Sequence, residues 1–282
     1  MKIISWNLNS RSNTAILSRQ CDYLLEGNFD IITLQEISTR SEDFIKRTLR
    51  DKGGYFLVSS FDLADDHSIL KGRRKFGEII ASRFRFSTND PNQVDIPYPE
   101  RVLSVRLTEG YLGLDIHTTH VPPGSTNGVI KVEHFEGLYR FLTKNLQGIR
   151  ILTGDFNSPQ AEHINLGVVT WGQRILSSNR LKYYIKPLWR NSCTAERWDA
   201  AERNIIENVD HLLLYDVFRS SLSNDNGEGY SWIIKRNGRL TKRRYDHIFA
   251  SKSIKTVNCY YDQEPRDHGL SDHSPVIAEF DL

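Results

Sequence analysis

The chain has 282 residues, of which 39% are hydrophobic and 26% are charged, and its formal net charge is +2. This composition excludes global disorder and allows a sizeable α/β core, while the small net charge neither indicates nor excludes a nucleic-acid partner. The three cysteines, Cys21, Cys193 and Cys259, are widely spaced and contain no Cys-x-x-Cys pair, which argues against a disulfide framework and a zinc site. No stretch approaches the length of a membrane span, and "MKIISWNLNS" has too short an apolar run for a signal peptide, so we expect a soluble cytoplasmic protein without a membrane partner.

Strands and helices are predicted to alternate along the first half of the chain. Residues 2–7 and 29–36 have the composition of short buried strands, and residues 12–26 between them have apolar residues at helical spacing. A helix is predicted from Ser41 to Leu49. Four strand-like runs follow it: "YFLVSS", "FGEIIAS", "RVLSVRL" and "YLGLDIHTTH".

The second half continues this pattern with a helix over residues 130–146 and a strand at "RILTG". Residues 160–209 are less regular and are predicted to include a helix with Trp198, Ala201 and Ile205 on one face together with Val209. Four strands end the chain: "YSWIIK", "RYDHIFAS", "KTVNCYYD" and "SPVIAEF". Many strands interrupted by a few helices predict a single α/β domain over residues 1–282, with two mixed β-sheets packed face to face and helices outside.

Polar residues gather where the predicted strands end. Each has an ordinary structural explanation, since Asn and Asp cap helices and form turns, and an isolated His is often a hydrogen-bonded structural residue. These residues are Asn7, Asn9, Glu36, His117, His120, Asp155, Asn157, Asp246, His247, Asp272 and His273. Because strand ends gather at one rim of a layered α/β domain, together they indicate a site for Mg²⁺ and phosphate, in which carboxylates bind the cation and amides and imidazoles donate to phosphate.

Five motifs occur in order beside the predicted strands: "WNLN" at 6–9, "LQE" at 34–36, "GDFN" at 154–157, "YDHIFAS" at 245–251 and "SDH" at 271–273. In these motifs the chain resembles the endonuclease/exonuclease/phosphatase superfamily, which includes exonuclease III, apurinic endonucleases and deoxyribonuclease I. The resemblance spans nearly the whole chain, and "HVPPGSTNG" looks like the exonuclease III-like branch, with Asn127 as a candidate substrate contact. It implies a four-layer α/β sandwich and a metal-dependent phosphoesterase.

The resemblance also implies a metal site that takes Mg²⁺, with Mn²⁺ as a substitute. Glu36 matches the principal metal ligand, and Asn7 matches the amide beside it that positions metal and phosphate. Asn9 lies where some members have a polar residue near the metal. Asp272 matches a residue near the metal that could belong to a second site.

Four further residues match groups that act on the phosphate. Asp155 matches the acid that holds or deprotonates the nucleophilic water, and Asn157 matches an amide that stabilises charge on phosphate. Asn157 also has the simpler interpretation of an Asx-type turn partner. Asp246 matches the acid that pairs with the terminal histidine, which His273 matches. The implied mechanism is in-line attack of water on a phosphodiester.

The chain departs from the apurinic endonucleases at two positions. They have a tyrosine where this chain has His120, whereas deoxyribonuclease I and the lipid phosphatases have a histidine in this region. The resemblance therefore implies that His120 could be a general acid for the leaving oxygen, although it could also be a histidine that fixes the loop. Where they have apolar pocket residues before the acid of the "YDH" motif, this chain has Arg243, Arg244 and Tyr245. An arginine does not build an apolar pocket for a bare sugar, so abasic-site specificity is in doubt.

Two basic runs are candidate substrate contacts. "KGRRK" covers residues 71–75, with acidic Asp62, Asp65 and Asp66 nearby, and "KRNGRLTKRR" covers residues 235–244. Arg243 and Arg244 could bind phosphate, while Trp232 or Tyr230 could stack on a base. Both runs could equally be solvated hairpin loops, with Trp232 in the core.

Three functions remain open from the sequence. The first is a Mg²⁺-dependent nuclease whose partner is nucleic acid, DNA before RNA. The second is a phosphoesterase for a small substrate such as a phosphoinositide, a phospholipid head group or a nucleotide. The third is a catalytically silent nucleic-acid-binding module, which the presence of Glu36, Asp155 and His273 disfavours.

Overall fold

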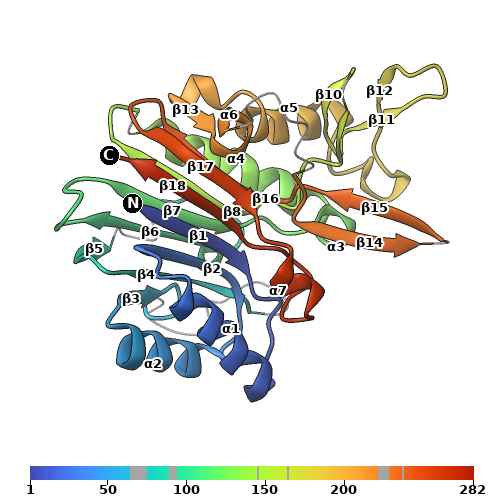
Figure 1. Cartoon of the computed structure of the whole chain (residues 1–282). Coiled ribbons are helices and arrows are strands. Elements are labelled where there is room, and N and C mark those ends of the chain that lie inside the picture. Colours follow the sequence, from blue (N-terminus) through green and yellow to red (C-terminus); the bar gives the residue numbers. More distant parts are fainter. Residues whose placement is uncertain (64–74, 89–93, 145, 164, 222–228, 237) are drawn as a thin grey trace.

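Two six-stranded mixed β-sheets form the centre of the structure (Figure 1). The computed structural model describes residues 1–63, 75–88, 94–144, 146–163, 165–221, 229–236 and 238–282. The first sheet has the order β17 (Lys255–Tyr261), β18 (Val276–Asp281), β1 (Lys2–Asn7), β2 (Ile31–Ile37), β4 (Gly77–Ser82), β3 (Phe56–Ser59). The second has the order β13 (Leu214–Asp216), β16 (Asp246–Ser251), β8 (Arg150–Asp155), β7 (Asp115–His120), β6 (Val102–Leu107), β5 (Phe86–Thr88).

The two sheets pack face to face because alternate residues of their strands are apolar on both sides. In β1, Ile3 lies in the core between the sheets, while Ile4 lies in the core on the outer side of the first sheet. Ile116 and Ile151 of the second sheet belong to the same core as Ile3. This alternation turns Ser5 and Asn7, which follow Ile3 at period two, toward the second sheet.

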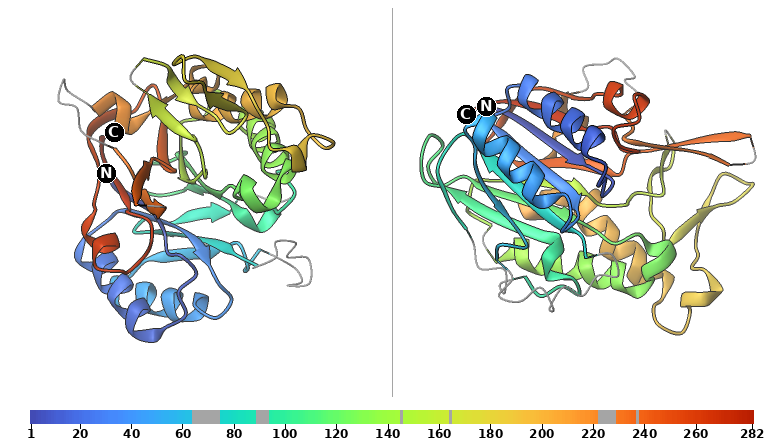
Figure 2. Two further views of the ribbon diagram at one scale, coloured as in Figure 1. Left: turned by 90° about the vertical axis from the view of Figure 1, so that its right-hand side faces the viewer. Right: turned by 90° about the horizontal axis from the view of Figure 1, so that it is seen from below.

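Helices cover the outer face of each sheet. The pair α1 (Thr14–Glu26) and α2 (Glu42–Gly53) packs on the first sheet, and the pair α4 (Val129–Thr143) and α5 (Ala195–Ile206) packs on the second. The left view of Figure 2 shows the blue pair on one outer side and the green and gold helices on the other. The predicted four-layer α/β sandwich with two mixed sheets inside is confirmed.

Shorter elements connect these layers and lie mostly near one end of the sandwich. The strands are β9 (Ala161–His163), β10 (Gly167–Val169), β11 (Gln173–Ile175), β12 (Leu181–Tyr183), β14 (Trp232–Arg236) and β15 (Arg239–Arg243). The helical turns are η3 (Pro99–Arg101), α3 (Gly124–Asn127), η4 (Pro187–Trp189), η5 (Val209–Leu212), α6 (Val217–Ser221) and α7 (Glu264–Asp267). The hairpins β11–β12 and β14–β15 project from the end opposite the two chain termini (Figure 1). No helix among the residues with described structure is long and apolar enough to cross a membrane.

The strands differ from the sequence prediction mainly in these hairpins. The prediction ended one strand at residue 235 and began the next at 244, and so missed β15, which pairs antiparallel with β14. The irregular stretch after residue 160 contains two small hairpins before α5, whose inner face carries Trp198, Ala201 and Ile205 as predicted. Residues 71–74 of the first basic run, and Asp65 and Asp66, lie outside the described residues.

Candidate active site

The strand ends bring the predicted polar residues to one rim of the two sheets. Asn7 ends β1 opposite Gln35 of the parallel strand β2, and His120 ends β7 opposite Asp155 of the parallel strand β8. Asp246 begins the antiparallel strand β16 opposite Asp155. Parallel strands end at the same edge, and an antiparallel neighbour begins there, so these residues converge as the sequence predicted.

The backbone at this rim is held in uncommon conformations. Asn9, Glu36 and Asn157 all have positive φ, at 56°, 55° and 49°. Gly154, immediately before Asp155, has φ 141°, and a Cβ there would lie 1.9 Å from the carbonyl oxygen of Thr119. Such conformations are costly for most residues and persist where the surrounding structure fixes them, which is common at functional sites.

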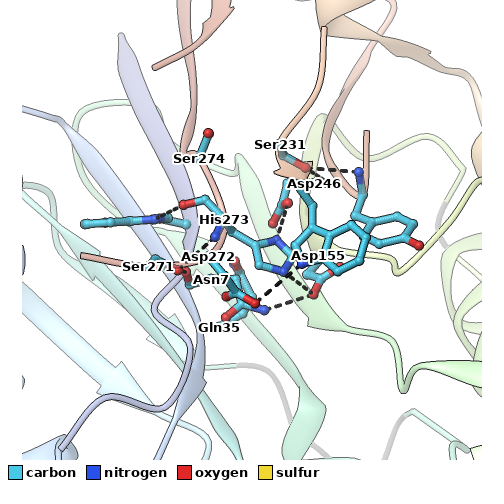
Figure 3. A network of polar contacts seen from close by, with 12 residues as sticks. Asn7, Gln35, Asp155, Ser231, Asp246, Ser271, Asp272, His273 and Ser274 are labelled. Carbon is cyan, nitrogen blue, oxygen red and sulfur yellow. Dashed lines mark hydrogen bonds and ion pairs between the residues drawn. The ribbon is translucent and has the colours of Figure 1, made fainter. Parts of the chain in front are cut away.

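Asp155 lies at the centre of the site (Figure 3). Its Oδ2 accepts hydrogen bonds from the side-chain amides of Asn7 at 2.9 Å and Asn157 at 3.3 Å, and its Oδ1 accepts one from the backbone N–H of Asn157 at 2.8 Å. Burial raises the pKa of Asp155 to about 7, against the opposing effect of the positive His273. A fixed carboxyl group with a pKa near neutrality suits a general base.

His273 and Asp246 form a buried pair beside Asp155. Nδ1 of His273 lies 2.7 Å from Oδ2 of Asp246, and its Nε2 lies 3.9 Å from Oδ2 of Asp155 (Figure 3). Burial alone would lower the pKa of His273, but the Asp246 and Asp155 carboxylates raise it to about 10. The imidazole is therefore protonated at neutral pH, and its Nε2–H is a fixed donor directed at the site.

The loop that carries His273 is tied to the first strand. Ser271 donates through Oγ to the backbone oxygen of Asn7 at 2.6 Å and accepts from the backbone N–H of His273 at 3.1 Å. The indole N–H of Trp6 donates to the backbone oxygen of His273 at 3.0 Å. These hydrogen bonds thus fix the position of the "SDH" loop relative to the "WNLN" strand.

Glu36 and His120 lie close together beside Asp155, in a group of side chains that could bind a cation. Nε2 of His120 lies 3.4 Å from Oε1 of Glu36 and 3.8 Å from Oδ2 of Asp155. Both ring nitrogens of His120 are buried without a hydrogen-bond partner among the described residues, and burial raises the pKa of Glu36. A divalent cation would stabilise both carboxylates, and oxygen and imidazole donors within this reach fit such an ion.

The general-acid role expected for His120 does not agree with its surroundings. Burial, with the positive charges of Arg101 and His273, holds its pKa well below its usual range. The ring is neutral at pH 7 and therefore carries no readily donated proton. Its position beside Glu36 and Asp155 fits a neutral ligand or acceptor better.

The remaining predicted metal and amide residues lie around this centre. Asp272 is exposed at the pocket and accepts from the indole N–H of Trp232 at 3.4 Å. Asn9 is half-buried, and its backbone N–H donates to Oδ1 of Asn7 at 2.8 Å. The side-chain amide of Asn157 donates to the backbone oxygen of Val121 at 2.9 Å as well as to Asp155. Asn157 thus takes part in the turn and also lines the pocket.

A cavity of about 350 Å³ opens over these residues. Arg243 and Trp232, two predicted substrate contacts, line it beside Glu36, Asp155 and His273. This size is within the range of ordinary ligand pockets. The structure therefore brings both predicted contacts to the metal and base side chains.

The two other predicted substrate contacts lie elsewhere. The Arg244 side chain is only 1% exposed and forms ion pairs with Glu162 at 2.7 Å and Asp216 at 2.6 Å, so it is committed to the core. Arg243 ends β15 and lines the pocket, whereas Arg244 lies in the short link between β15 and β16, where its side chain contacts Glu162 and Asp216. Asn127 donates to the backbone oxygen of Pro123 at 3.0 Å and ends α3 outside the pocket lining.

A buried polar cluster near Glu36 is absent from the residues predicted from the sequence. Glu78 and Arg101 are both buried, and each has side-chain atoms without a hydrogen-bond partner in the described part of the chain. Burial raises the pKa of Glu78 well above its usual range. The glutamate in the strand-like run "FGEIIAS" was a visible signal, since a charged residue interrupts an otherwise apolar strand.

The polar cluster that supports the loop after Asp155, formed around Lys131 and Glu202, is also absent from the residues predicted from the sequence. Lys131 of α4 and Glu202 of α5 form a fully buried ion pair at 2.8 Å. Lys131 donates to the backbone oxygen of Asn157 at 2.8 Å, and Glu202 accepts from Ser158, from the backbone of Trp171 and from the indole N–H of Trp198. This cluster connects the helices to the "GDFN" loop.

Comparison with known proteins agrees with this geometry. The sequence pattern of the Endonuclease/Exonuclease/phosphatase family matches residues 4–273. The chain belongs to this family. Its members are phosphoric ester hydrolases that depend on a divalent metal, and this chain is an enzyme of that class. No curated protein sequence matches the chain.

Solved structures show the same fold at low sequence identity. An AP endonuclease from Archaeoglobus fulgidus has a TM-score of 0.68 and 22% identity, and the match covers 100% of both chains. The 3′ phosphatase NExo from Neisseria, bound to a product DNA hairpin, has a TM-score of 0.65 and 24% identity over 100% of both chains. TDP2 from D. rerio, in complex with a single-strand DNA product, has a TM-score of 0.61 and 16% identity over 100% of this chain and 99% of its own.

Proposed function

We propose that this protein is a Mg²⁺-dependent nuclease that hydrolyses phosphodiester bonds of DNA by in-line attack of water. The observation that carries this proposal is the pocket in which Glu36, Asp155 and His273 lie beside Arg243. Carboxylates for a cation, a base with a pKa near 7, a protonated donor and an arginine are the groups that phosphodiester hydrolysis requires. The DNA-bound relatives NExo and TDP2 support DNA as the substrate.

The residues of the site divide the chemistry between them. Asp155, held by Asn7 and Asn157, accepts the proton of the attacking water. His273, kept protonated by Asp246, donates through Nε2 to a phosphate oxygen and stabilises the charge that develops there. Glu36, with Asp272 on the exposed side, would hold Mg²⁺ through carboxylate oxygens, with Mn²⁺ as a substitute, and the neutral ring of His120 lies beside Glu36. When bound, the cation adds electrostatic stabilisation of the same charge.

A substrate panel tests the proposal directly. Purified protein is incubated with Mg²⁺ or Mn²⁺ and with single-stranded, duplex and abasic DNA, RNA oligonucleotides, and small phosphate esters. We expect metal-dependent cleavage of DNA that Glu36→Ala abolishes, because the variant lacks a ligand for the cation. Phosphate release from small esters with every nucleic acid intact would support a small-molecule phosphoesterase instead. Tight DNA binding without turnover with either metal would support a silent binding module.

We also propose a cytoplasmic location. Cys21, Cys193 and Cys259 are buried free thiols, which agrees with a reducing compartment. Fractionation of cells that express the chain with an epitope tag would check this location, and recovery in an extracellular or periplasmic fraction would contradict it.

A further inference from the structure

Tryptophan is the most frequent residue type in the lining of the cavity over the catalytic residues. Four of the five tryptophans of the chain line it: Trp171, Trp189, Trp198 and Trp232. Tyr245 and Arg243 complete the aromatic and basic wall beside Asp155 and His273. Exposing so much aromatic surface to one cavity is unfavourable in water, and such surface typically marks a binding site for an apolar or aromatic group.

Three of these indoles are fixed by their N–H groups. Trp171 donates to the backbone oxygen of Asn157 at 3.0 Å, and Trp232 donates to Asp272 at 3.4 Å. Trp198 donates to Glu202 at 2.7 Å. The guanidinium of Arg243 stacks over Trp171, with Cζ 4.9 Å from the ring centroid. These walls are therefore oriented before a ligand arrives, which lowers the entropic cost of binding.

Trp189 differs from the other three. Its indole Nε1 is buried and has no hydrogen-bond partner among the residues that the structure describes. A buried donor without an acceptor is costly, and buried Trp N–H groups are usually paired. Because this N–H is buried, it is closed to a ligand, and Trp189 takes part in the cavity wall through the rest of its ring.

The segments that carry Trp171, Trp189 and Trp232 are basic and contain no acid. Residues 163–195 contain five basic residues and residues 231–245 contain six, and neither stretch contains Asp or Glu. The rest of the chain is therefore net negative, although the total is +2. The basic residues of the first stretch are Arg174, Arg180, Lys182, Lys186 and Arg190, and all five are exposed. Lys186 and Arg243 line the cavity itself, and the hairpins β11–β12 and β14–β15 project from the same end of the molecule (Figure 1).

From these contacts we propose that the cavity binds an unpaired nucleotide through its base, immediately beside the phosphate to be cleaved. This inference rests on the proposed nuclease function and specifies its substrate. The base stacks against the tryptophan walls, and the flanking phosphates lie along the two basic hairpins. Aromatic stacking platforms combined with basic grooves are the means by which proteins bind single strands without reading sequence. A bare abasic sugar leaves these walls uncovered and is the poorer ligand.

Binding without divalent metal tests this inference separately from catalysis. The affinity of a short single-stranded DNA, measured by fluorescence anisotropy in EDTA, is compared with that of a strand of equal length and charge built from abasic analogues. We expect the strand with bases to bind at least about 5-fold tighter, the lower end of stacking energies per base. Trp189→Ala and Trp232→Ala, on two walls, should each reduce this ratio toward one without changing affinity for the abasic strand.

Leu188→Ala is the matched control, because Leu188 is next to Trp189, is 75% exposed and lies outside the cavity lining. It should leave the ratio unchanged. The unfolding temperature of each variant identifies any loss of fold. One tryptophan variant that stays folded is enough to test whether the cavity binds the base. Equal affinity of the wild type for both strands, or an equal loss for both strands in the tryptophan variants, would overturn the base pocket. A base preference without DNA cleavage would support the pocket and contradict the nuclease proposal instead.

Discussion

Burial and neighbouring charges give Asp155 and His273 different roles: Asp155 is the proton acceptor and His273 is the hydrogen-bond donor. Burial raises the pKa of the Asp155 carboxyl group to about 7, so it is ready to accept a proton. The pKa of His273 is lowered by burial but raised further by Asp246, to about 10, so the imidazole keeps its proton. The donor and the acceptor thus lie 3.9 Å apart, each in the protonation state that hydrolysis needs.

Replacing the partner of His273 should change the pH profile in a defined direction. In Asp246→Asn one of the carboxylates that raise the pKa of His273 is gone while burial still lowers it, so this pKa should fall below its value of about 10. The protonated form is then lost as the pH rises through a lower value than in the wild type. We expect kcat/KM at pH 8 to fall by about 10²–10³-fold, as for loss of one transition-state donor.

The same variant should lose less activity at pH 5.5, where more of the imidazole is protonated. Ser104→Ala is a suitable control, because Ser104 contacts the buried His117, which is outside the pocket. Equal losses for Asp246→Asn at pH 5.5 and pH 8 would contradict the protonated-donor role of His273.

At the residue scale, the motifs predicted which side chains meet, but not their chemical state. Strand ends and motif order were enough to bring Asn7, Asp155 and Asp246 to one rim. The sequence could not tell Arg243 from Arg244, because only the fold shows that β15 ends at Arg243 and that Glu162 and Asp216 lie beside Arg244. The neutral state of His120 depends on complete burial, which no local pattern reveals.

At the scale of elements, the helices α4 and α5 hold the catalytic loop through one buried ion pair. Lys131 and Glu202 bind Asn157, Ser158 and Trp171 as well as each other. Lys131→Met should lower the free energy of unfolding by about 3 kcal/mol or more, because it leaves a buried carboxylate without its charge partner. Chemical denaturation measures this change.

The exposed ion pair between the same helices is the control for that experiment. Arg197 and Glu136 lie 2.8 Å apart, with side chains 43% and 29% exposed. Arg197→Met should cost at most about 1 kcal/mol, as surface pairs do. Equal losses for the two variants would show that the buried pair has no special part in holding the two helices together.

The hairpins β11–β12 and β14–β15 are the elements that sequence periodicity predicted least well. Their strands are three to five residues long and half-exposed, so they show neither a long apolar run nor clear alternation. The Asn-Gly dipeptide at residues 237–238 was a hairpin signal within the second basic run. Trp232 is a candidate substrate contact from the sequence, whereas nothing in the sequence singles out Trp171 and Trp189 until the fold places them at the same cavity.

At the scale of the whole molecule, charge is separated in space while the net charge stays near zero. Basic residues are concentrated in the two hairpin segments at the catalytic end, and the rest of the chain is net negative. Such a field guides a polyanion to the site and turns it away from other faces. The net charge of +2 therefore does not show that positive charge is concentrated near the site. The fold shows that the two basic segments lie at the same end of the molecule.

The salt dependence of binding tests this separation. Lys186→Gln should reduce the slope of log K against log salt for single-stranded DNA by about 0.7, since it removes one phosphate contact. Lys52→Gln, an exposed lysine on α2 at the outer face of the first sheet, should leave the slope unchanged. Equal slopes for Lys186→Gln and the wild type would contradict a phosphate path along the hairpin.

The rate of cleavage of an end-labelled single-stranded DNA, measured with and without Mg²⁺ in the wild type and in Asp155→Asn, tests the proposed nuclease activity most directly. We expect cleavage by the wild type only when Mg²⁺ is present. We also expect a loss of about 10²–10⁴-fold in Asp155→Asn, the usual contribution of a general base. Cleavage that is independent of the metal, or that Asp155→Asn leaves within a few-fold of the wild type, would contradict the proposal.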